Sequence, residues 1–132
     1  MGSANVLFLI GRIIFGIYWL ISAGGHLFFN RAALKGYARS KRVPAPGIAI
    51  GITGILLLFG GAGILLGVYT TWAIGALILF LLPVTLTMHN FWIDRDAASR
   101  TSNMMNFSKN MALLAALLML LAIPTPWPFA LF

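Results

Sequence analysis

Residues 47–67 read GIAIGITGILLLFGGAGILLG and contain no charged side chain. A helix needs about 20 consecutive apolar residues to cross the roughly 30 Å hydrocarbon core of a bilayer, and this stretch has that length. The strands of a membrane β-barrel would instead alternate apolar and polar residues over about ten positions. The stretch therefore predicts a membrane-spanning α-helix.

The same pattern recurs on both sides of this stretch. Apolar runs also cover residues 6–29, 72–92 and 107–123, and the prolines at 124, 126 and 128 end the last run by removing backbone donors. Of the 132 residues, 61% are hydrophobic and 8% are charged, whereas a soluble domain carries about 25% charged residues. The sequence predicts an all-α integral membrane four-helix bundle, with residues 1–132 forming a single domain.

The distribution of charge predicts the orientation of this bundle. The net charge is +7, and every Lys and Arg except Arg12 falls in or beside the connections 30–46 and 93–106. An even number of spans brings these two connections to one side of the membrane and both termini to the other. Because basic loops remain in the cytoplasm, we expect a bacterial-type inner-membrane protein with both termini on the non-cytoplasmic side.

Cations within the first connection follow a helical spacing. Arg31, Lys35, Arg39 and Arg42 fall on one face if residues 31–42 form a helix. We expect an interfacial helix whose cations contact lipid headgroups or a partner; a solvated basic loop is the alternative. Because this cluster lies between two spans, we expect no nucleic-acid partner.

Arg12 is the one basic residue expected near the outer side. It lies inside the first span, and the acidic residues of the chain, Asp94 and Asp96, belong to a connection on the opposite side. A charge within the bilayer is costly. We therefore expect Arg12 to snorkel outward or to contact a lipid headgroup or a partner subunit.

Polar and aromatic side chains gather near the predicted cytoplasmic ends of the spans. Two histidines on two helices could hydrogen-bond a quinone while Trp92 stacks on its ring; local hydrogen bonding at headgroup level is the alternative. Haem is disfavoured because both histidines lie near the interface, and we expect no metal site. Tyr18 and Trp19, near the middle of the first span, either pack in the core or contact a ligand. The candidate ligand or quinone residues are His26, His89, Asn90, Trp92, Lys109 and Asn110.

The order of several short motifs resembles that of DoxX-type (DoxX/DoxD-like) membrane proteins. The resemblance covers nearly the whole chain and implies a four-helix membrane bundle. Some members take part in quinone-coupled oxidation, for example as the small membrane subunit of a thiosulfate:quinone oxidoreductase. The motifs are Gly11-Arg12, Ser22-Ala23-Gly24-Gly25-His26, Val43-Pro44-Ala45-Pro46, Leu65-Leu66-Gly67, His89-Asn90-Phe91-Trp92 and residues 107–113.

The chain departs from the pattern of that family at three positions. Members often carry a lysine where His26 stands, a glutamate where Leu57 stands and an acidic residue near Asn103. A Lys–Glu pair between the first two spans therefore cannot form here. This difference weakens a catalytic interpretation.

These observations favour a protein that is not an enzyme by itself. The sequence has no nucleophile–base pair, phosphate-binding loop or carboxylate dyad of the kind that catalysis requires. The preferred interpretation is an accessory subunit that contacts lipids and other membrane subunits of a larger redox or energy-transducing complex and needs no cofactor of its own. The alternative is a quinone-handling small subunit of a membrane oxidoreductase.

Overall fold

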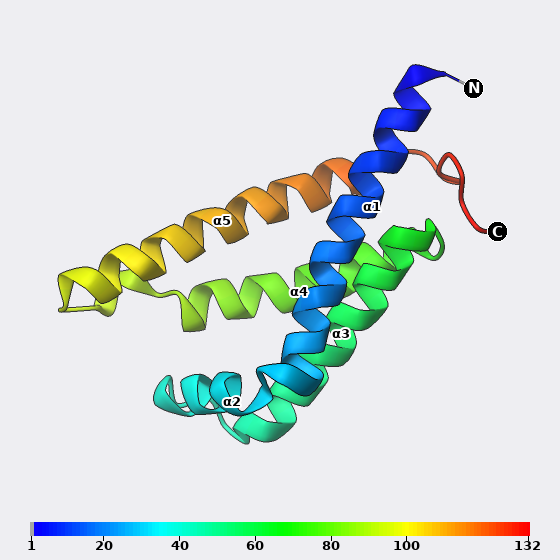
Figure 1. Cartoon of the computed structure of the whole chain (residues 1–132). Coiled ribbons are helices and arrows are strands. Elements are labelled where there is room, and N and C mark those ends of the chain that lie inside the picture. Colours follow the sequence, from blue (N-terminus) through cyan, green and yellow to red (C-terminus); the bar gives the residue numbers. More distant parts are fainter. Residues whose placement is uncertain (1) are drawn as a thin grey trace.

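The structure, a computed structural model, describes residues 2–132, and this part of the chain is helical without strands. Figure 1 shows the arrangement of its helices. Their bounds are α1 Ser3–Gly24, the π-helical turn η1 Gly25–Phe29, α2 Arg31–Ser40, α3 Pro46–Leu66, α4 Thr70–Met88, the 3₁₀ turn η2 Phe91–Ile93 and α5 Ala97–Leu121. Four segments are long and apolar enough to cross a bilayer: Ser3–Phe29, Pro46–Leu66, Thr70–Ile93 and Ala97–Leu121. The predicted fold class is thus confirmed, and the chain is a multi-pass membrane protein.

Helix α3 lies at the centre of the packing. It contacts α1 on one side and α4 on the other, whereas α5 packs chiefly against α4 and α2 lies beside the beginning of α3 (Figure 1). The two ends of the chain lie at one end of the molecule, and α2 and the α4–α5 connection lie at the other. The most buried large side chains come from α1, α3, α4 and α5: Trp19, Leu57, Ile64, Ile74, Leu77, Leu81 and Leu117.

Glycines of α3 allow this central helix to approach its neighbours closely. A Cβ added to Gly61 would lie 3.0 Å from both the Leu20 nitrogen and the Trp19 Cβ of α1, and a Cβ added to Gly60 would overlap the Leu77 side chain of α4. In lipid, where apolar burial does not drive helices together, such backbone proximity supplies much of the attraction.

Helix α5 begins earlier than the hydropathy indicates. It starts at Ala97 rather than near Phe107, because the Asp96 carboxylate accepts a 2.9 Å hydrogen bond from the Ser99 amide and caps the first turn. The short helix expected over residues 31–42 is present as α2, Arg31–Ser40. Both differences from the expected bounds lie at helix ends, and at α5 the polar cap rather than hydropathy sets the boundary.

The segment after α5 folds back over the turn between α3 and α4. Gly67 ends α3 with a φ of +72°, and Leu131 beyond α5 donates a 3.0 Å backbone hydrogen bond to the Leu66 carbonyl. Trp127 is buried and packs edge-on against Phe8 at a centroid distance of 5.3 Å. The C-terminal segment therefore closes this end of the bundle.

Arg12 joins α1 to this C-terminal segment. Its side chain is 5% exposed, and its guanidinium donates hydrogen bonds of 2.6 Å to the Pro128 carbonyl and 2.9 Å to the Phe129 carbonyl. The Nε atom is buried without a partner. Backbone carbonyls of the same chain thus meet the charge that was expected to snorkel outward or to contact a lipid headgroup or a partner subunit, and lipid or partner contact by Arg12 stays a prediction.

Candidate functional site

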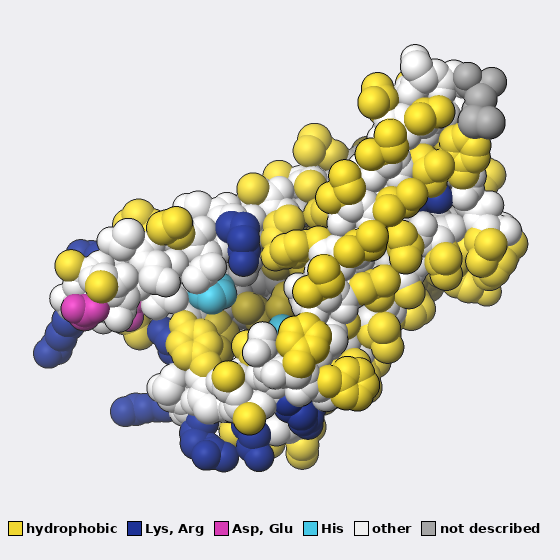
Figure 2. Space-filling model, in the orientation of Figure 1, with side chains coloured by type: hydrophobic (Ala, Val, Ile, Leu, Met, Phe, Trp, Pro, Cys, Tyr) yellow, Lys and Arg dark blue, Asp and Glu magenta, His cyan; other side chains and the backbone are white. Residues whose placement is uncertain are grey.

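A cavity of about 360 Å³ lies at the end of the bundle that carries α2. Figure 2 shows a hollow between α5, α1 and α2, with histidine side chains on its wall. The hollow is open on the side between α1 and α5, since α5 packs chiefly on α4. Most of the lining is apolar, and the polar lining residues are Ser22, His26, Tyr37, Thr53, Thr87, His89, Lys109 and Asn110.

His26 reaches the cavity from a π-helical turn at the end of α1. The wider turn is closed by a 2.9 Å hydrogen bond from the Asn30 amide to the Gly25 carbonyl, and such turns often occur at functional sites. The His26 Nδ1 atom lies 2.9 Å from the Ser22 carbonyl oxygen. The imidazole also meets Phe80 of α4 edge-on, with a centroid distance of 5.5 Å. These contacts hold the ring in one orientation.

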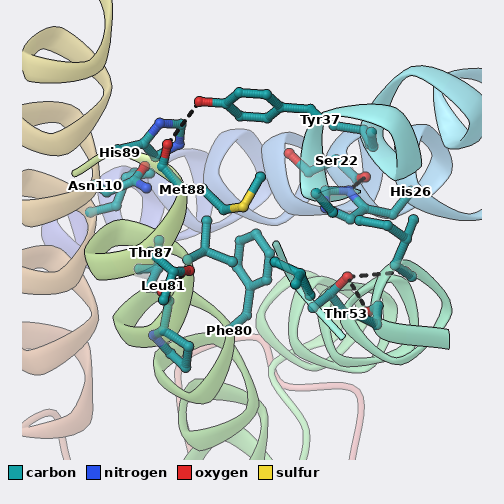
Figure 3. Close-up of a pocket in the computed structure, with 18 of the residues that line it drawn as sticks. Ser22, His26, Tyr37, Thr53, Phe80, Leu81, Thr87, Met88, His89 and Asn110 are labelled. Atoms are coloured by element: carbon teal, nitrogen blue, oxygen red, sulfur yellow. Dashed lines mark hydrogen bonds between the residues drawn. The ribbon is translucent and has the colours of Figure 1, made fainter. Parts of the chain in front are cut away.

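His89 follows the last turn of α4 and belongs to a polar network. Its Nδ1 atom lies 3.4 Å from the Asn103 Oδ1 atom, and the Asn103 amide nitrogen donates a 2.8 Å hydrogen bond to the Asp94 carboxylate. The Tyr37 hydroxyl lies 2.7 Å from the Met88 carbonyl and 3.1 Å from the Asn103 Oδ1 atom. In Figure 3, His89 and His26 lie on opposite sides of the cavity, with Tyr37 between them along one edge.

The surroundings of Tyr37 in α2 also change the pKa of its phenol. Its partial burial raises the pKa of the phenol above the ordinary value, and the nearby Asp94 carboxylate raises the pKa further, against an opposing effect of the hydrogen bond with Asn103. The Tyr37 side chain therefore stays neutral as a hydrogen-bonding group at physiological pH.

Helix α5 contributes two neighbouring side chains to the cavity. Asn110 is buried and donates a 3.1 Å hydrogen bond to the Thr85 hydroxyl of α4, which holds α5 beside α4 at this level. Lys109 lines the cavity from an exposed position. One residue thus positions the helix and the other brings a cation to the cavity wall.

Trp19 supplies a buried donor to the same cavity. The side chain is 1% exposed, lines the cavity and has no hydrogen-bond partner for its indole Nε1 atom. A buried donor without an acceptor costs about 1–3 kcal/mol. An acceptor atom on a bound molecule would remove this cost.

Two of the residues expected at the ligand site lie outside the cavity lining. The Asn90 side chain accepts a 2.7 Å hydrogen bond from Lys41, and Trp92 is half exposed and packs with Phe91 and Phe107. The cavity thus brings together His26, His89, Lys109 and Asn110 from the expected set. Asn90 and Trp92 stabilise the α4–α5 connection instead.

The basic residues of the α2 region divide into two groups. Arg31 donates a 3.0 Å hydrogen bond to the Gly47 carbonyl, and Lys35 also lies beside Gly47 at the beginning of α3. Arg39 and Arg42 are exposed. Lipid-headgroup or partner contact by these four residues therefore stays a prediction; Lys35 is exposed as well, and Arg31 is the least accessible of the four.

Several cavity residues had not been expected from the sequence. Tyr37 comes from α2, and Ser22, Thr53 and Thr87 come from three different spans. The sequence offered two signals for these residues. Tyr37 is an aromatic residue on a short basic helix, and the small hydroxyl residues lie near the ends of the spans. The hydroxyls of Ser22, Thr53 and Thr87 donate to carbonyls of their own helices, which leaves lone pairs on the oxygens.

The size and lining of the cavity suit a small lipid-soluble molecule. Ligand pockets measure about 300–1,000 Å³ and are mostly apolar with a few placed polar groups. Over residues 2–132, no group of three His, Cys, Asp or Glu side chains lies close enough together to hold a metal ion. An apolar ring with polar substituents matches the lining better than an ion does.

Comparison with known proteins agrees with this architecture. The family model described as DoxX matches residues 7–90, which is more than half of the chain and covers most of α1 and all of α2, α3 and α4. No curated protein and no solved structure matches the chain.

Proposed function

The chain belongs to the DoxX family of membrane proteins, and from this premise we propose that it binds a quinone-class molecule in the cavity between its helices. It would do so as the small membrane subunit of an oxidoreductase whose other redox groups belong to partner subunits. The observation that carries the proposal is the convergence of His26, His89 and Trp19 on one largely apolar cavity.

The cavity offers the contacts that such a ring requires. Phe80 and Leu81 supply apolar surface, and both histidines and the unpartnered Trp19 donor supply polar contacts for oxygen substituents. In the proposed membrane orientation the opening between α1 and α5 (Figure 2) would face lipid, so that an isoprenoid or alkyl tail could remain in the bilayer while the ring enters. The residues of this chain would bind and orient the ring and keep bulk water from one side of it.

A second candidate function is that of an accessory subunit that stabilises a larger complex without handling a quinone. The exposed face of α5 favours this function. Its methionines Met105 and Met119 are 68% and 67% exposed, and flexible methionine side chains adapt well to partner surfaces. The Arg12 charge does not add support, since the C-terminal segment accepts two of its hydrogen bonds.

The proposal includes an orientation in a bacterial-type inner membrane. Eight of the nine Lys and Arg residues belong to α2, the α2–α3 and α4–α5 connections and α5 as far as its middle, toward the end of the molecule that carries α2 (Figure 2). By the positive-inside rule this end faces the cytoplasm, with lipid headgroups around Arg39 and Arg42. Reporter fusions at the two ends of the chain should both report the non-cytoplasmic side.

Occlusion of the cavity tests quinone binding. Thr53 lines the cavity and its hydroxyl bonds only to the Ala49 and Ile50 carbonyls of its own helix, so Thr53→Phe fills space without removing a contact between helices. Native mass spectrometry in nanodiscs should show binding of an alkylated benzoquinone or benzoquinol to the wild-type chain and a loss of at least about tenfold in affinity for Thr53→Phe.

The matched control is Thr71→Phe, the same substitution at an exposed position outside this cavity. It should leave binding unchanged. If the wild-type chain binds neither molecule, or if Thr53→Phe binds as well as wild type, the cavity is not a quinone site. Loss of assembly of a membrane complex on deletion of the chain, together with absent binding, would favour the accessory function.

A further inference from the structure

We infer that the cavity selects the reduced, hydroxyl-bearing form of its ligand over the carbonyl form. The inference rests on the proposed function and specifies which partner in the quinone–quinol pair binds. Its basis is the direction of the hydrogen bonds that position the two histidines. A carbonyl oxygen can only accept a hydrogen bond, whereas a hydroxyl group both donates and accepts.

The contact between His26 and Ser22 determines one direction. The Nδ1 atom of His26 faces the Ser22 carbonyl oxygen at 2.9 Å, and because this oxygen only accepts, Nδ1 must carry the proton. In a neutral imidazole the other nitrogen is then an acceptor. His26 therefore offers Nε2 as a lone pair to a ligand that donates.

The same logic applies to His89 through a longer chain of contacts. The Asp94 carboxylate only accepts, so the Asn103 amide nitrogen, 2.8 Å away, must face it. Asn103 then presents its Oδ1 atom to the Nδ1 atom of His89 at 3.4 Å. Nδ1 of His89 donates, and Nε2 is again left as an acceptor.

Two donors of the lining face no acceptor within the described residues, and one of them, the Lys109 ammonium, comes from an exposed residue that water or lipid headgroups can also satisfy. The Tyr37 hydroxyl has the Met88 carbonyl as an acceptor at 2.7 Å, and Asn110 donates to Thr85. The buried Trp19 Nε1 donor has no partner. A hydroxyl can accept from Trp19 and donate to a histidine, whereas a carbonyl can only accept and leaves each histidine Nε2 without a donor.

Asp94 acts in this scheme as a positioning residue. It does not line the cavity, but its carboxylate sets the orientation of the Asn103 amide and hence the tautomer of His89. Removal of the charge by Asp94→Asn would let the Asn103 side chain rotate and present its NH₂ group. His89 would then carry its proton on Nε2 and become a donor toward the cavity.

The inference is tested first on the wild-type chain with three probes of similar shape. The probes are an alkylated 1,4-benzoquinol, the corresponding benzoquinone and the dimethyl ether of the quinol. Affinities are measured anaerobically in nanodiscs at about pH 8, where a histidine of ordinary pKa near 6.5 is neutral. The quinol should bind about two- to tenfold more tightly than the other two, the range expected for one added hydrogen bond.

Each alternative result of this comparison contradicts one specific part of the inference. If the benzoquinone binds as tightly as the quinol, the selection is absent while the proposed function stands. If the dimethyl ether matches the quinol, hydrogen donation by the ligand is not used. If none of the three probes binds, the proposed function itself fails.

The network is tested with Asp94→Asn and its matched control Asp96→Asn. Asp96 caps α5 and takes no part in the contacts to Asn103. We expect Asp94→Asn to move the His89 proton to Nε2, visible in ¹⁵N NMR shifts, and to reduce the preference for quinol, while Asp96→Asn changes neither. A changed tautomer with an unchanged preference would overturn the role of His89, and an unchanged tautomer would overturn the role of Asp94.

Discussion

Replacement of Arg12 by methionine should release the C-terminal segment from the end of the bundle. In the structure the guanidinium donates to the Pro128 and Phe129 carbonyls at 2.6 and 2.9 Å, whereas methionine keeps an apolar stem and has no N–H group. A hydrogen bond that involves a charged group contributes about 1.5–3 kcal/mol net. The buried Nε atom has no partner, so we take the lower value for each bond. The free energy of attachment should fall by about 3 kcal/mol.

This loss corresponds to a detached population that is larger by a factor on the order of 100, since about 1.4 kcal/mol is a factor of ten. The chain contains no cysteine, so Ala130→Cys introduces a single thiol. Ala130 lies against the turn at Gly67, with its Cα 3.2 Å from where a Gly67 Cβ would be. The rate of labelling by a water-soluble maleimide then reports the detached population.

The labelling rate should rise toward 100-fold in Arg12→Met. It should be unchanged in Arg39→Met, which removes an exposed arginine of α2 at the other end of the bundle. Arg12→Lys should give an intermediate rate, because a single ammonium group cannot match the planar two-pronged geometry of guanidinium. A rate for Arg12→Met equal to that of the wild-type background would refute the reasoning, because the two carbonyl contacts would then contribute nothing to the attachment.

Three further predictions follow from other contacts. Gly61→Leu should lower stability by roughly 1–3 kcal/mol in thermal unfolding in detergent, because it overpacks the α1–α3 contact, and Gly75→Leu, which points into open space, should not. Hydrogen bonds from Ser99 lower the pKa of Asp96, so the cap stabilises α5 fully above the unfolded pKa of about 3.9 and is lost as pH falls through the lower folded value. The NMR signal of the Ser99 amide should therefore shift only in strong acid, and Asp96→Asn should remove this dependence. Tyr37→Phe should lower stability by about 1 kcal/mol through the lost 2.7 Å bond to the end of α4; an unchanged Tm would contradict this.

The spans could be predicted because the bilayer tolerates only long apolar helices with internally satisfied backbones. The start of α5 could not be located in this way. Residues 97–106 are largely polar, and their helix depends on the cap by Asp96 and on the contact between Asn103 and Asp94. Hydropathy reports which residues lie in lipid, and it carries no information on how far a helix continues beyond it.

The sequence predicted how deep in the membrane the site residues lie. It did not predict toward which side of its helix each side chain points. His26, His89 and Asn110 reach the cavity, whereas Asn90 and Trp92, expected at the same level, do not. Such directions depend on local turns, including the π-helical turn that carries His26. The carbonyl partners of Arg12 could not be predicted from the sequence for a different reason. They lie 116 and 117 residues away in the chain, and every residue has a backbone carbonyl, so no residue type reveals them.

Under the proposed function, the opening between α1 and α5 would determine where the protein samples a quinone-class ligand. A side entrance makes the bilayer the reservoir, so occupancy depends on the mole fraction of the ligand in lipid rather than on its concentration in water. A strongly partitioning molecule is already concentrated there, and a modest intrinsic affinity then suffices for high occupancy and rapid exchange. Affinities for different tail lengths should consequently converge when they are expressed per lipid, because the tail never leaves its solvent.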